Sequence, residues 1–370
     1  MLYELRPHHL TSFQSSTRFQ GFEVQDGDRL CYNGHAVPSN VMHFLPGRPF
    51  PVLFCAPTRP QALDPETIVC TEELGPTEPE LVVVGGYRPA GISRTMYGYN
   101  FRLDKWRVLP AVAPARAEPA VVAMNDEIYC LGGKVYPALV PTCDRYSVDT
   151  NCWNSLAPMR EPRWRCSAVV ADSDLVVVGG EGVAATSRTT EFCDGKNWRK
   201  GPDLLQAREE YGVAVMGKRL YVCGGLQKSG DVLATVEMYD PATGKWRTTP
   251  PMVTARCFFG LAAVGEGMYA IGGVESLAPH TMLRSVERYD CTSASWRLCR
   301  ALPHPLYGFS TLVKGTQIYA IGGHNGAQYV KTILIYDTVT DTWSWGTPLP
   351  EPLCHNRSAI VWTSRTLAAL

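Results

Sequence analysis

The sequence predicts an all-β fold, a propeller of six four-stranded antiparallel blades. Three observations lead to this prediction. Pairs of adjacent glycines recur at intervals of 45 to 50 residues, an apolar run precedes each pair, and an aromatic residue followed by a tryptophan comes after it. A repeat of this length matches one small unit of several strands, and six repeats in succession indicate units that stack on one another.

The glycine pairs mark the ends of six predicted strands. Short apolar runs bounded by turn residues are typical of buried strands. Glycine suits a place where two backbones approach closely, because it carries no Cβ. The runs lie at 81–84, 128–131, 175–178, 220–223, 268–271 and 318–321, and the glycine pairs at 85/86, 132/133, 179/180, 224/225, 272/273 and 322/323.

A hairpin is predicted after each glycine pair. An aromatic residue and, six or seven positions later, a tryptophan flank turn-forming residues, most clearly in segment 239–246 (YDPATGKW). We expect each tryptophan to bury on the order of 200 Å² between blades. The pairs are Tyr99 and Trp106, Tyr146 and Trp153, Phe192 and Trp198, Tyr239 and Trp246, Tyr289 and Trp296, and Tyr336 and Trp343.

A fourth strand per repeat follows a proline-rich connection and an arginine that stands sixteen residues before the next glycine pair. The arginines are Arg116, Arg163, Arg208 and Arg256, and leucine takes their place at Leu306 and Leu353. A twisted four-stranded sheet cannot bury both of its faces alone. The sheets should therefore stack face to face around an axis.

This combination of glycine pair, Tyr-Asp, tryptophan and opening arginine resembles the kelch repeat. The resemblance covers about residues 80 to 363 and implies a six-bladed kelch propeller of the Kelch-like type. Phe192-Cys193 departs from the pattern where Tyr-Asp is expected, as do Leu306 and Leu353. We place the propeller at 80–364, with repeats near 80–109, 117–156, 164–201, 209–249, 257–299 and 307–346.

The two ends of the chain complete the predicted organisation. We expect residues 355–362 to form the innermost strand of the first blade and close the ring; the alternative is Thr67–Cys70. Residues 1–79 contain ten prolines, carry a net charge of about −4 and show no repeat. They should form an extension with little helix, and Met42–Ala56 is apolar enough to pack on the propeller. No BTB or BACK domain, which Kelch-like adaptors place before the propeller, is recognisable.

Composition limits the function. Thirty-five basic and 35 acidic residues leave no net charge, which argues against a nucleic-acid partner. No apolar stretch is long enough to span a membrane, so we expect a soluble, cytoplasmic protein. The 13 cysteines include no Cys-x-x-Cys and are expected to be reduced. No catalytic motif is present, and we expect no catalytic residue, metal or cofactor.

The loops at one end of the ring are the predicted binding surface. In adaptors that this chain resembles, a partner peptide is held by the residues just after the opening arginine, just after the glycine pair and about five beyond it. We expect an acidic sector of Glu181, Glu209 and Glu210, and a basic one of Lys134, Arg165, His324 and His355. Aromatic anchors are Tyr87, Trp164, Tyr307 and Tyr329. A structural explanation stays open for each: a glutamate that is merely solvated, or Trp164 packed under a loop.

The resemblance implies a non-enzymatic module that captures a segment of a partner protein at the propeller mouth, as the substrate-recognition part of a cullin-RING ubiquitin ligase adaptor. Two alternatives are a cytoskeletal, actin-binding kelch protein and a metal-dependent kelch enzyme. Filament cosedimentation and elemental analysis distinguish them.

Overall fold

The structure, a computed structural model, describes residues 78–363 except positions 149 and 184; within the first 77 residues it describes the backbone of six short strands. The chain divides into two compact units, Thr77–Thr363 and Met1–Pro76 with Ser364–Leu370. Within the described part, no helix is long and apolar enough to cross a membrane.

The smaller unit contains two antiparallel sheets of three short strands each. One has the order β1 (Leu2–Glu4), β6 (Val52–Phe54) and β5 (Met42–His43), and the other β2 (Phe22–Gln25), β3 (Arg29–Tyr32) and β4 (His35–Ala36). Of Met42–Ala56 the structure describes only the backbone of β5 and β6, so the predicted packing of this segment on the propeller stays a prediction, and the alternative closing strand Thr67–Cys70 falls outside the described residues.

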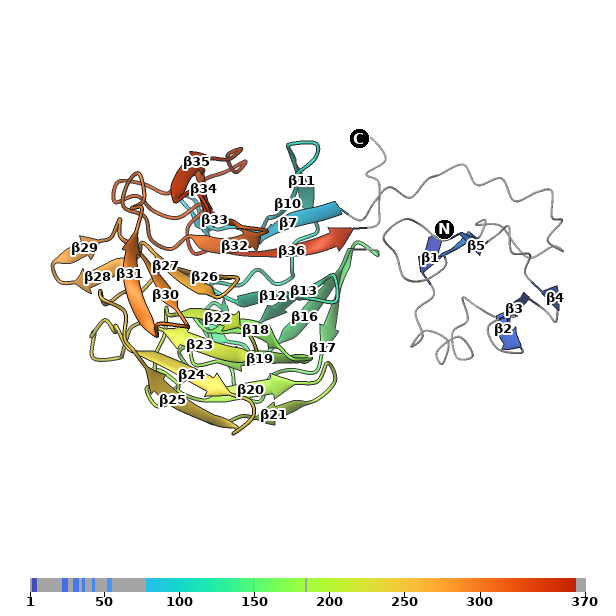
Figure 1. Cartoon of the computed structure of the whole chain (residues 1–370), viewed down its shortest axis with the longest axis horizontal. Helices are drawn as coiled ribbons and strands as arrows, with labels where there is room; N and C mark the ends of the chain where they lie inside the picture. Colours follow the sequence, from blue (N-terminus) through green and yellow to red (C-terminus); the bar gives the residue numbers. More distant parts are fainter. Residues whose placement is uncertain are drawn as a thin grey trace. The chain divides into compact units, whose positions relative to one another are not determined.

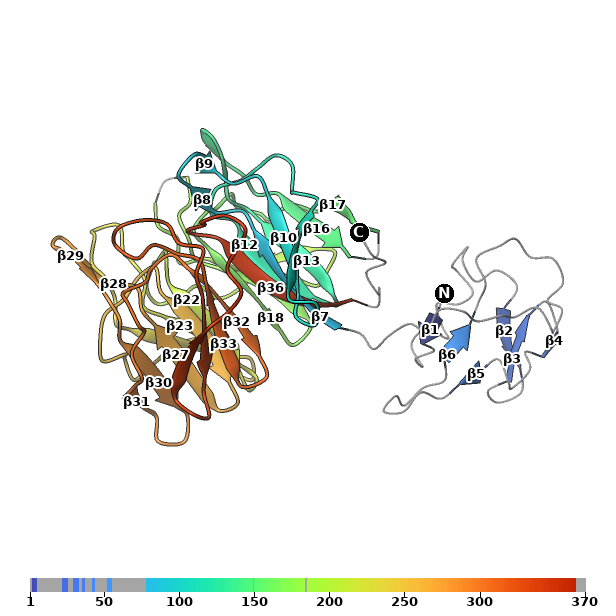
Figure 2. The same ribbon diagram turned by 90° about the horizontal axis from the view of Figure 1, so that it is seen from above.

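The larger unit is a six-bladed propeller of four-stranded antiparallel blades, as predicted (Figures 1 and 2). The innermost strands touch one another in a closed ring. From the axis outward, blade 1 consists of β36 (Arg357–Thr363), β7 (Glu78–Val84), β10 (Met96–Asn100) and β11 (Lys105–Leu109). Blade 2 consists of β12 (Ala120–Met124), β13 (Glu127–Leu131), β16 (Cys143–Ser147) and β17 (Cys152–Leu156). Blade 3 consists of β18 (Ser167–Ala171), β19 (Asp174–Val178), β20 (Thr190–Cys193) and β21 (Trp198–Lys200).

The other three blades repeat this arrangement. Blade 4 consists of β22 (Gly212–Met216), β23 (Arg219–Cys223), β24 (Val236–Asp240) and β25 (Lys245–Thr249). Blade 5 consists of β26 (Gly260–Val264), β27 (Gly267–Ile271), β30 (Val286–Asp290) and β31 (Ser295–Cys299). Blade 6 consists of β32 (Ser310–Lys314), β33 (Gln317–Ile321), β34 (Ile333–Asp337) and β35 (Thr342–Trp345). Short hairpins after three glycine pairs are β8 (Tyr87–Arg88) with β9 (Gly91–Ile92), β14 (Lys134–Val135) with β15 (Ala138–Leu139), and β28 (Val274–Leu277) with β29 (His280–Met282).

The C-terminal strand closes the ring, as predicted. β36 pairs antiparallel with β7, from Arg357 opposite Val84 to Thr363 opposite Glu78. The first and last segments of the propeller therefore share one sheet, and blade 1 has four strands like the other five blades.

The strand register corrects the alignment of the third repeat. Cys193, and not Phe192, lies opposite Trp198, as Tyr239 lies opposite Trp246 in the next blade. Asp194 then takes the aspartate position, and its Oδ1 accepts hydrogen bonds from two backbone N–H groups in the turn. The prediction that Phe192 replaces the tyrosine is wrong because the turn of this hairpin is two residues shorter: Cys193 and Trp198 are five residues apart, whereas Tyr239 and Trp246 are seven apart.

The glycine pairs connect neighbouring blades. The backbone N–H of Gly225 donates to the carbonyl of Arg256 in the next blade at 2.9 Å, and four other blades repeat this bond. Gly225 has a φ of 103°, and a Cβ there would stand 2.8 Å from the Glu209 carbonyl oxygen. Only glycine fits this position without displacing backbone.

The opening arginines are buried between blades with an acidic partner that the sequence analysis did not identify. The partner is always two residues before the aromatic position of the hairpin. Arg163 lies 2.8 Å from Glu191, Arg208 lies 2.6 Å from Glu237 and Arg256 lies 2.5 Å from Glu287. Arg116 pairs in the same way with Asp144. These residues are structural, because both members of each pair are almost completely buried.

Candidate functional site at the axial mouth

Six residues, one from each blade, form a ring at one end of the axis, here called the axial ring. Each stands two positions before an innermost strand and has a positive φ, which is uncommon for residues other than glycine. Backbone hydrogen bonds connect several neighbours, among them Arg165 N–H to the Glu118 carbonyl at 3.2 Å and Phe258 N–H to the Glu210 carbonyl at 3.0 Å. The members are Glu118 (φ 48°), Arg165 (51°), Glu210 (51°), Phe258 (54°), Gly308 (62°) and His355 (53°).

A second ring surrounds the axial ring. In every blade, the residue after the opening arginine or leucine forms a β-bridge with the residue after a glycine pair. The structure thus places the two predicted sets side by side. The bridges are Tyr87 with Cys354, Ala117 with Lys134, Trp164 with Glu181, Glu209 with Leu226, Cys257 with Val274, and Tyr307 with His324; Tyr329 bridges to His324 from the other side.

Blades 2 to 4 contribute a charged half of the mouth centred on Arg165. Its guanidinium lies 2.8 Å from Glu118, 3.4 Å from Glu210, 3.6 Å from Glu209 and 3.9 Å from Glu181. One cation therefore faces four carboxylates. The predicted separation into an acidic and a basic sector is wrong for Arg165, because the axis brings this residue into the middle of the glutamates.

Trp164 belongs to the structural support of this half. Its indole N–H donates to a Glu181 carboxylate oxygen at 2.8 Å, and the Arg165 guanidinium lies 4.3 Å from its ring centre. Lys134 approaches the same ring at 4.7 Å and that of the exposed Tyr136 at 5.0 Å. Trp164 is only 9% exposed, so its prediction as an exposed anchor gives way to the alternative of packing beneath neighbours.

Blades 5, 6 and 1 contribute an aromatic half. The Tyr307 ring lies 5.1 Å from His324, and His324 lies 5.4 Å from Tyr329. On the axial side Phe258 contacts Tyr307 at 6.3 Å and His355 at 5.4 Å. The series continues from His355 to Tyr87 at 5.9 Å. Gly308 stands between Phe258 and His355 in the axial ring and leaves space for the imidazole.

Burial changes the charge state of several mouth residues. Desolvation lowers the pKa of His355 to about 4 and also lowers the pKa of His324, so both imidazoles are neutral at pH 7. His355 is therefore not the basic residue that the sequence analysis expected. Burial raises the pKa of Glu209 to about 7, and burial with the neighbouring Glu118 carboxylate raises that of Glu210 well above its usual range.

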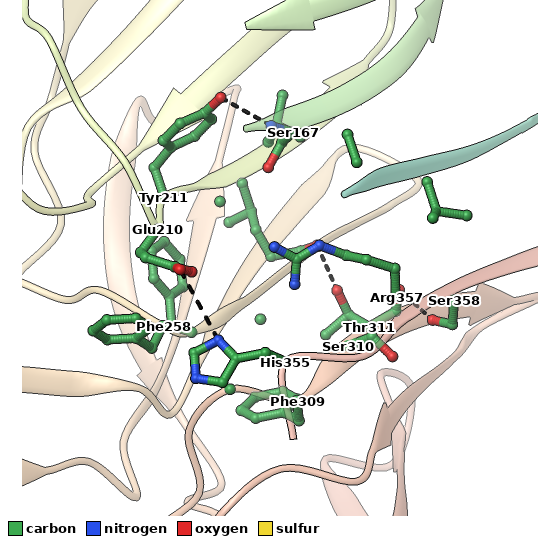
Figure 3. Close-up of a pocket in the computed structure, with 18 of the residues that line it drawn as sticks. Ser167, Glu210, Tyr211, Phe258, Phe309, Ser310, Thr311, His355, Arg357 and Ser358 are labelled. Atoms are coloured by element: carbon green, nitrogen blue, oxygen red, sulfur yellow. Dashed lines mark hydrogen bonds and ion pairs between the residues drawn. The ribbon is translucent and has the colours of Figure 1, made fainter. Parts of the chain in front are cut away.

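A cavity of about 140 Å³ lies on the axis beneath the ring (Figure 3). Glu210, Phe258 and His355 line it at the mouth, and the carboxylate of Glu210 faces the imidazole of His355. Further in, the first residues of the innermost strands line it: Ala120, Ser167, Gly212, Gly260, Ser310 and Arg357. Small side chains allow these strands to come close, since a Cβ on Gly212 would stand 2.5 Å from the Leu261 Cβ.

Glu118, Glu210 and His355 are brought together by the ring, although 92 residues separate Glu118 from Glu210 and 145 separate Glu210 from His355. One ligand-type atom from each lies within 4.8 Å of those of the other two. Such a group can hold a metal ion. Glu118 and Phe258 were not among the candidate residues; their offset from the opening residue, shared with Arg165, Glu210 and His355, is the signal that could have found them.

The known proteins that are similar to this chain are kelch-repeat proteins, in agreement with the fold. The family described as the KLHDC2/KLHL20/DRC7 Kelch-repeats domain matches residues 75–273 and 211–366. Kelch repeat and BTB domain-containing protein 12 of Danio rerio is 29% identical over 179 residues, which cover 40% of this chain and 28% of that protein. Kelch-like protein 23 of Homo sapiens is 27% identical over 168 residues, or 44% of this chain and 29% of that protein.

Two further matches are a protein with another name, beta-scruin, and a solved structure. Beta-scruin of Limulus polyphemus is 35% identical over 105 residues, covering 26% of this chain and 12% of that protein. Each of these three relatives is matched over less than a third of its own length. A solved structure titled "Structure of YjhT" superposes with a TM-score of 0.62 at 13% identity, covering 73% of this chain and 97% of that chain. That likeness concerns the fold alone.

Proposed function

This chain belongs to the KLHDC2/KLHL20/DRC7 Kelch-repeats domain family, and on that premise we propose that its propeller captures a segment of a partner protein at the axial mouth. The observation that carries the proposal is the division of the mouth into two chemically different halves. An aromatic and imidazole surface stands beside a carboxylate-rich one, and mixed surfaces of this kind are typical of binding hot spots.

The two halves suggest what the partner segment presents. Tyr307, His324 and Tyr329 are partly accessible, and a neutral His324 suits an apolar or aromatic side chain. Glu181 is 40% exposed and is the most accessible of the four carboxylates around Arg165. We propose a segment that places an apolar group over the aromatic half and a lysine or arginine beside Glu181.

The biological setting that we propose is substrate recognition for a cullin-RING ubiquitin ligase. Similarity to Kelch-like protein 23 and to Kelch repeat and BTB domain-containing protein 12 supports it. Actin binding is the second candidate, with beta-scruin among the relatives. Cosedimentation of the purified chain with actin filaments tests that candidate directly, and a chain that stays in the supernatant excludes it.

Affinity capture from cells with the full chain tests the proposal. The Tyr307→Ala/His324→Ala variant removes two accessible rings of the aromatic half and no ion pair. The control is Trp345→Ala, which removes an indole that is 64% exposed on the outer strand β35. We expect partners that are lost with the mouth variant and retained with the control, at unchanged melting temperature. Equal recovery by all three proteins contradicts a mouth site. A cullin among the recovered proteins supports the ligase setting, and its consistent absence argues against it.

A further inference from the structure

We propose that Glu118, Glu210 and His355 hold a divalent transition-metal ion at the mouth end of the axial cavity. The three residues come from blades 2, 4 and 1, and all belong to the axial ring. The inference is independent of partner capture, because it concerns the inner wall of the mouth and not its accessible surface.

The geometry allows one ion to contact all three side chains. The His355 Nδ1 and Glu210 Oε1 atoms are 4.0 Å apart, and the whole ligand set lies within 4.8 Å. Metal bonds to imidazole nitrogen and carboxylate oxygen are about 2.0–2.2 Å long, so two ligands on opposite sides of an ion stand about 4.2 Å apart. The 4.0 Å pair already matches this span. Only one pair can lie on opposite sides, and adjacent ligands of one ion stand about 3.0–3.6 Å apart, so a pair at the 4.8 Å limit needs to close by about 1 Å or more when the ion binds.

Two of the ligand atoms are buried without a hydrogen-bond partner. Among the described residues, neither Glu210 Oε1 nor His355 Nδ1 has one. The Glu210 side chain is only 5% exposed, and its carboxylate is aimed at the imidazole across the cavity (Figure 3). Buried polar atoms in folded proteins are nearly always satisfied. Glu210 Oε1 has only a 3.4 Å ion pair with Arg165 Nε, and it faces His355 Nδ1 at 4.0 Å, a distance that one ion can bridge, which points to a missing ligand between the two atoms.

The balance of charge favours a cation. Arg165 is the one cation within 4.0 Å of Glu118, Glu181, Glu209 and Glu210 in the described part of the chain. Glu118, Glu209 and Glu210 are buried. Buried carboxylates are normally paired or bound to a metal, because removing them from water is costly. Arg357, which lines the cavity beneath, is a second and more distant cation, and a divalent ion would add to the compensation that these two guanidinium groups provide.

Neighbouring groups hold the three ligands in place. Arg165 Nε donates to Glu118 Oε2 at 2.8 Å, which orients that carboxylate as outer-shell hydrogen bonds do in metal sites. The rings of Phe258 and Tyr87 both meet the imidazole of His355 edge-on, with interplanar angles of 87°. The cavity beneath provides room for water molecules that complete the coordination. One imidazole with two carboxylates suits Mn²⁺, Fe²⁺, Co²⁺ or Zn²⁺ better than Mg²⁺ or Ca²⁺.

The test uses the full chain, freed of metal by a chelator and titrated separately with Mn²⁺ and Zn²⁺. Electron paramagnetic resonance of free Mn²⁺ and calorimetry with Zn²⁺ measure affinity and stoichiometry. We expect one ion per chain, and a loss of affinity of about 100-fold or more in His355→Asn and in Glu210→Gln, since changes even to outer-shell groups cost 10–100-fold. The controls are His304→Asn and Glu161→Gln, both away from the mouth, which should bind as the wild type does.

X-ray absorption of the Zn²⁺-loaded wild-type chain keeps the proposal falsifiable if the variants fail to fold. We expect a first shell of nitrogen and oxygen that includes one imidazole. A shell containing sulfur would place the ion on cysteines and overturn the proposal. So would wild-type protein that takes up neither Mn²⁺ nor Zn²⁺, or a folded His355→Asn variant that binds both as tightly as the wild type.

Discussion

The buried arginine pairs allow a strong prediction, because the chain itself contains an apolar replacement for them. Blades 2 to 5 open with Arg116, Arg163, Arg208 or Arg256, and each arginine meets a carboxylate. Blade 6 has Leu306 in place of the arginine and Leu334 in place of the carboxylate, and both belong to one apolar cluster. In blade 1, Leu353 and Tyr97 likewise share a cluster. We predict that Arg208 and Glu237 can be replaced together but not singly.

The magnitude follows from burial. The side chains of Arg208 and Glu237 are 0% and 1% exposed and 2.6 Å apart. Removing one partner leaves the other charge buried and unpaired, which costs about 3–5 kcal/mol of the free energy of unfolding. Arg208→Leu and Glu237→Leu should each lose this amount. Two independent losses would add to about 6–10 kcal/mol, whereas the double variant should lie within about 1–3 kcal/mol of the wild type.

The loss of unfolding free energy that remains in the double variant also has a structural source. Glu237 accepts hydrogen bonds from the backbone N–H groups of Leu205 at 2.6 Å and Gln206 at 3.0 Å. Both apolar blades have proline at the position of Leu205, namely Pro303 and Pro350, which has no N–H to satisfy. Adding Leu205→Pro to the double variant should therefore recover part of the remaining loss.

Urea unfolding followed by tryptophan fluorescence and by circular dichroism measures the cycle for wild type, both single variants and the double variant. We expect a coupling energy of at least about 3 kcal/mol between the two sites. A double variant whose loss equals the sum of the single losses, with coupling below about 1 kcal/mol, would refute the reasoning.

Three further changes test other parts of the structure. Gly225→Ala should lower the melting temperature by several degrees, because its Cβ would stand 2.8 Å from the Glu209 carbonyl; Gly217→Ala, with nothing within 4 Å, is the control for positive φ alone. Arg165→Ala should destabilise the fold by about 3–5 kcal/mol, since three buried carboxylates lose their cation; an unchanged urea midpoint contradicts the network. Backbone N–H groups lower the pKa of Asp337, so its stabilisation is present above about pH 4 and is lost as the pH falls; Asp337→Asn should show a smaller drop in urea midpoint between about pH 5 and pH 3, and an identical drop would count against the turn.

The strands, the number of blades and the closing strand could be read from the sequence because their signals are local. Glycine pairs, apolar runs and the spacing from aromatic residue to tryptophan are each short patterns within one repeat. Because the pattern occurs six times, a departure in one repeat does not change the predicted fold. The hairpin of blade 3 shows the limit. Its turn is two residues shorter than in segment 239–246, so the spacing from aromatic residue to tryptophan selected Phe192 as the partner of Trp198, whereas the strand register selects Cys193.

The mouth was predicted as a location and only in part as chemistry. The offsets from the opening residues identified Trp164, Arg165, Glu210 and His355, but not which of them would be buried or which would meet. Arg165 was placed with the basic residues, yet it lies among glutamates from blades 2 to 4. His355 was expected to be charged, yet burial makes it neutral.

The sequence by itself thus determined the repeat, the strands, the ring closure and the positions, counted from the opening arginine or leucine, of the residues that each blade places at the mouth. Tertiary structure alone decided that Glu118, Glu210 and His355 converge on one point, that a single arginine serves four carboxylates and that Glu191, Glu237 and Glu287 pair with arginines. The physical reason is the same in each case. Secondary structure depends on neighbours along the chain, whereas charge state and coordination depend on groups that the folding of a blade or the closure of the ring brings within a few ångströms from distant positions in the chain.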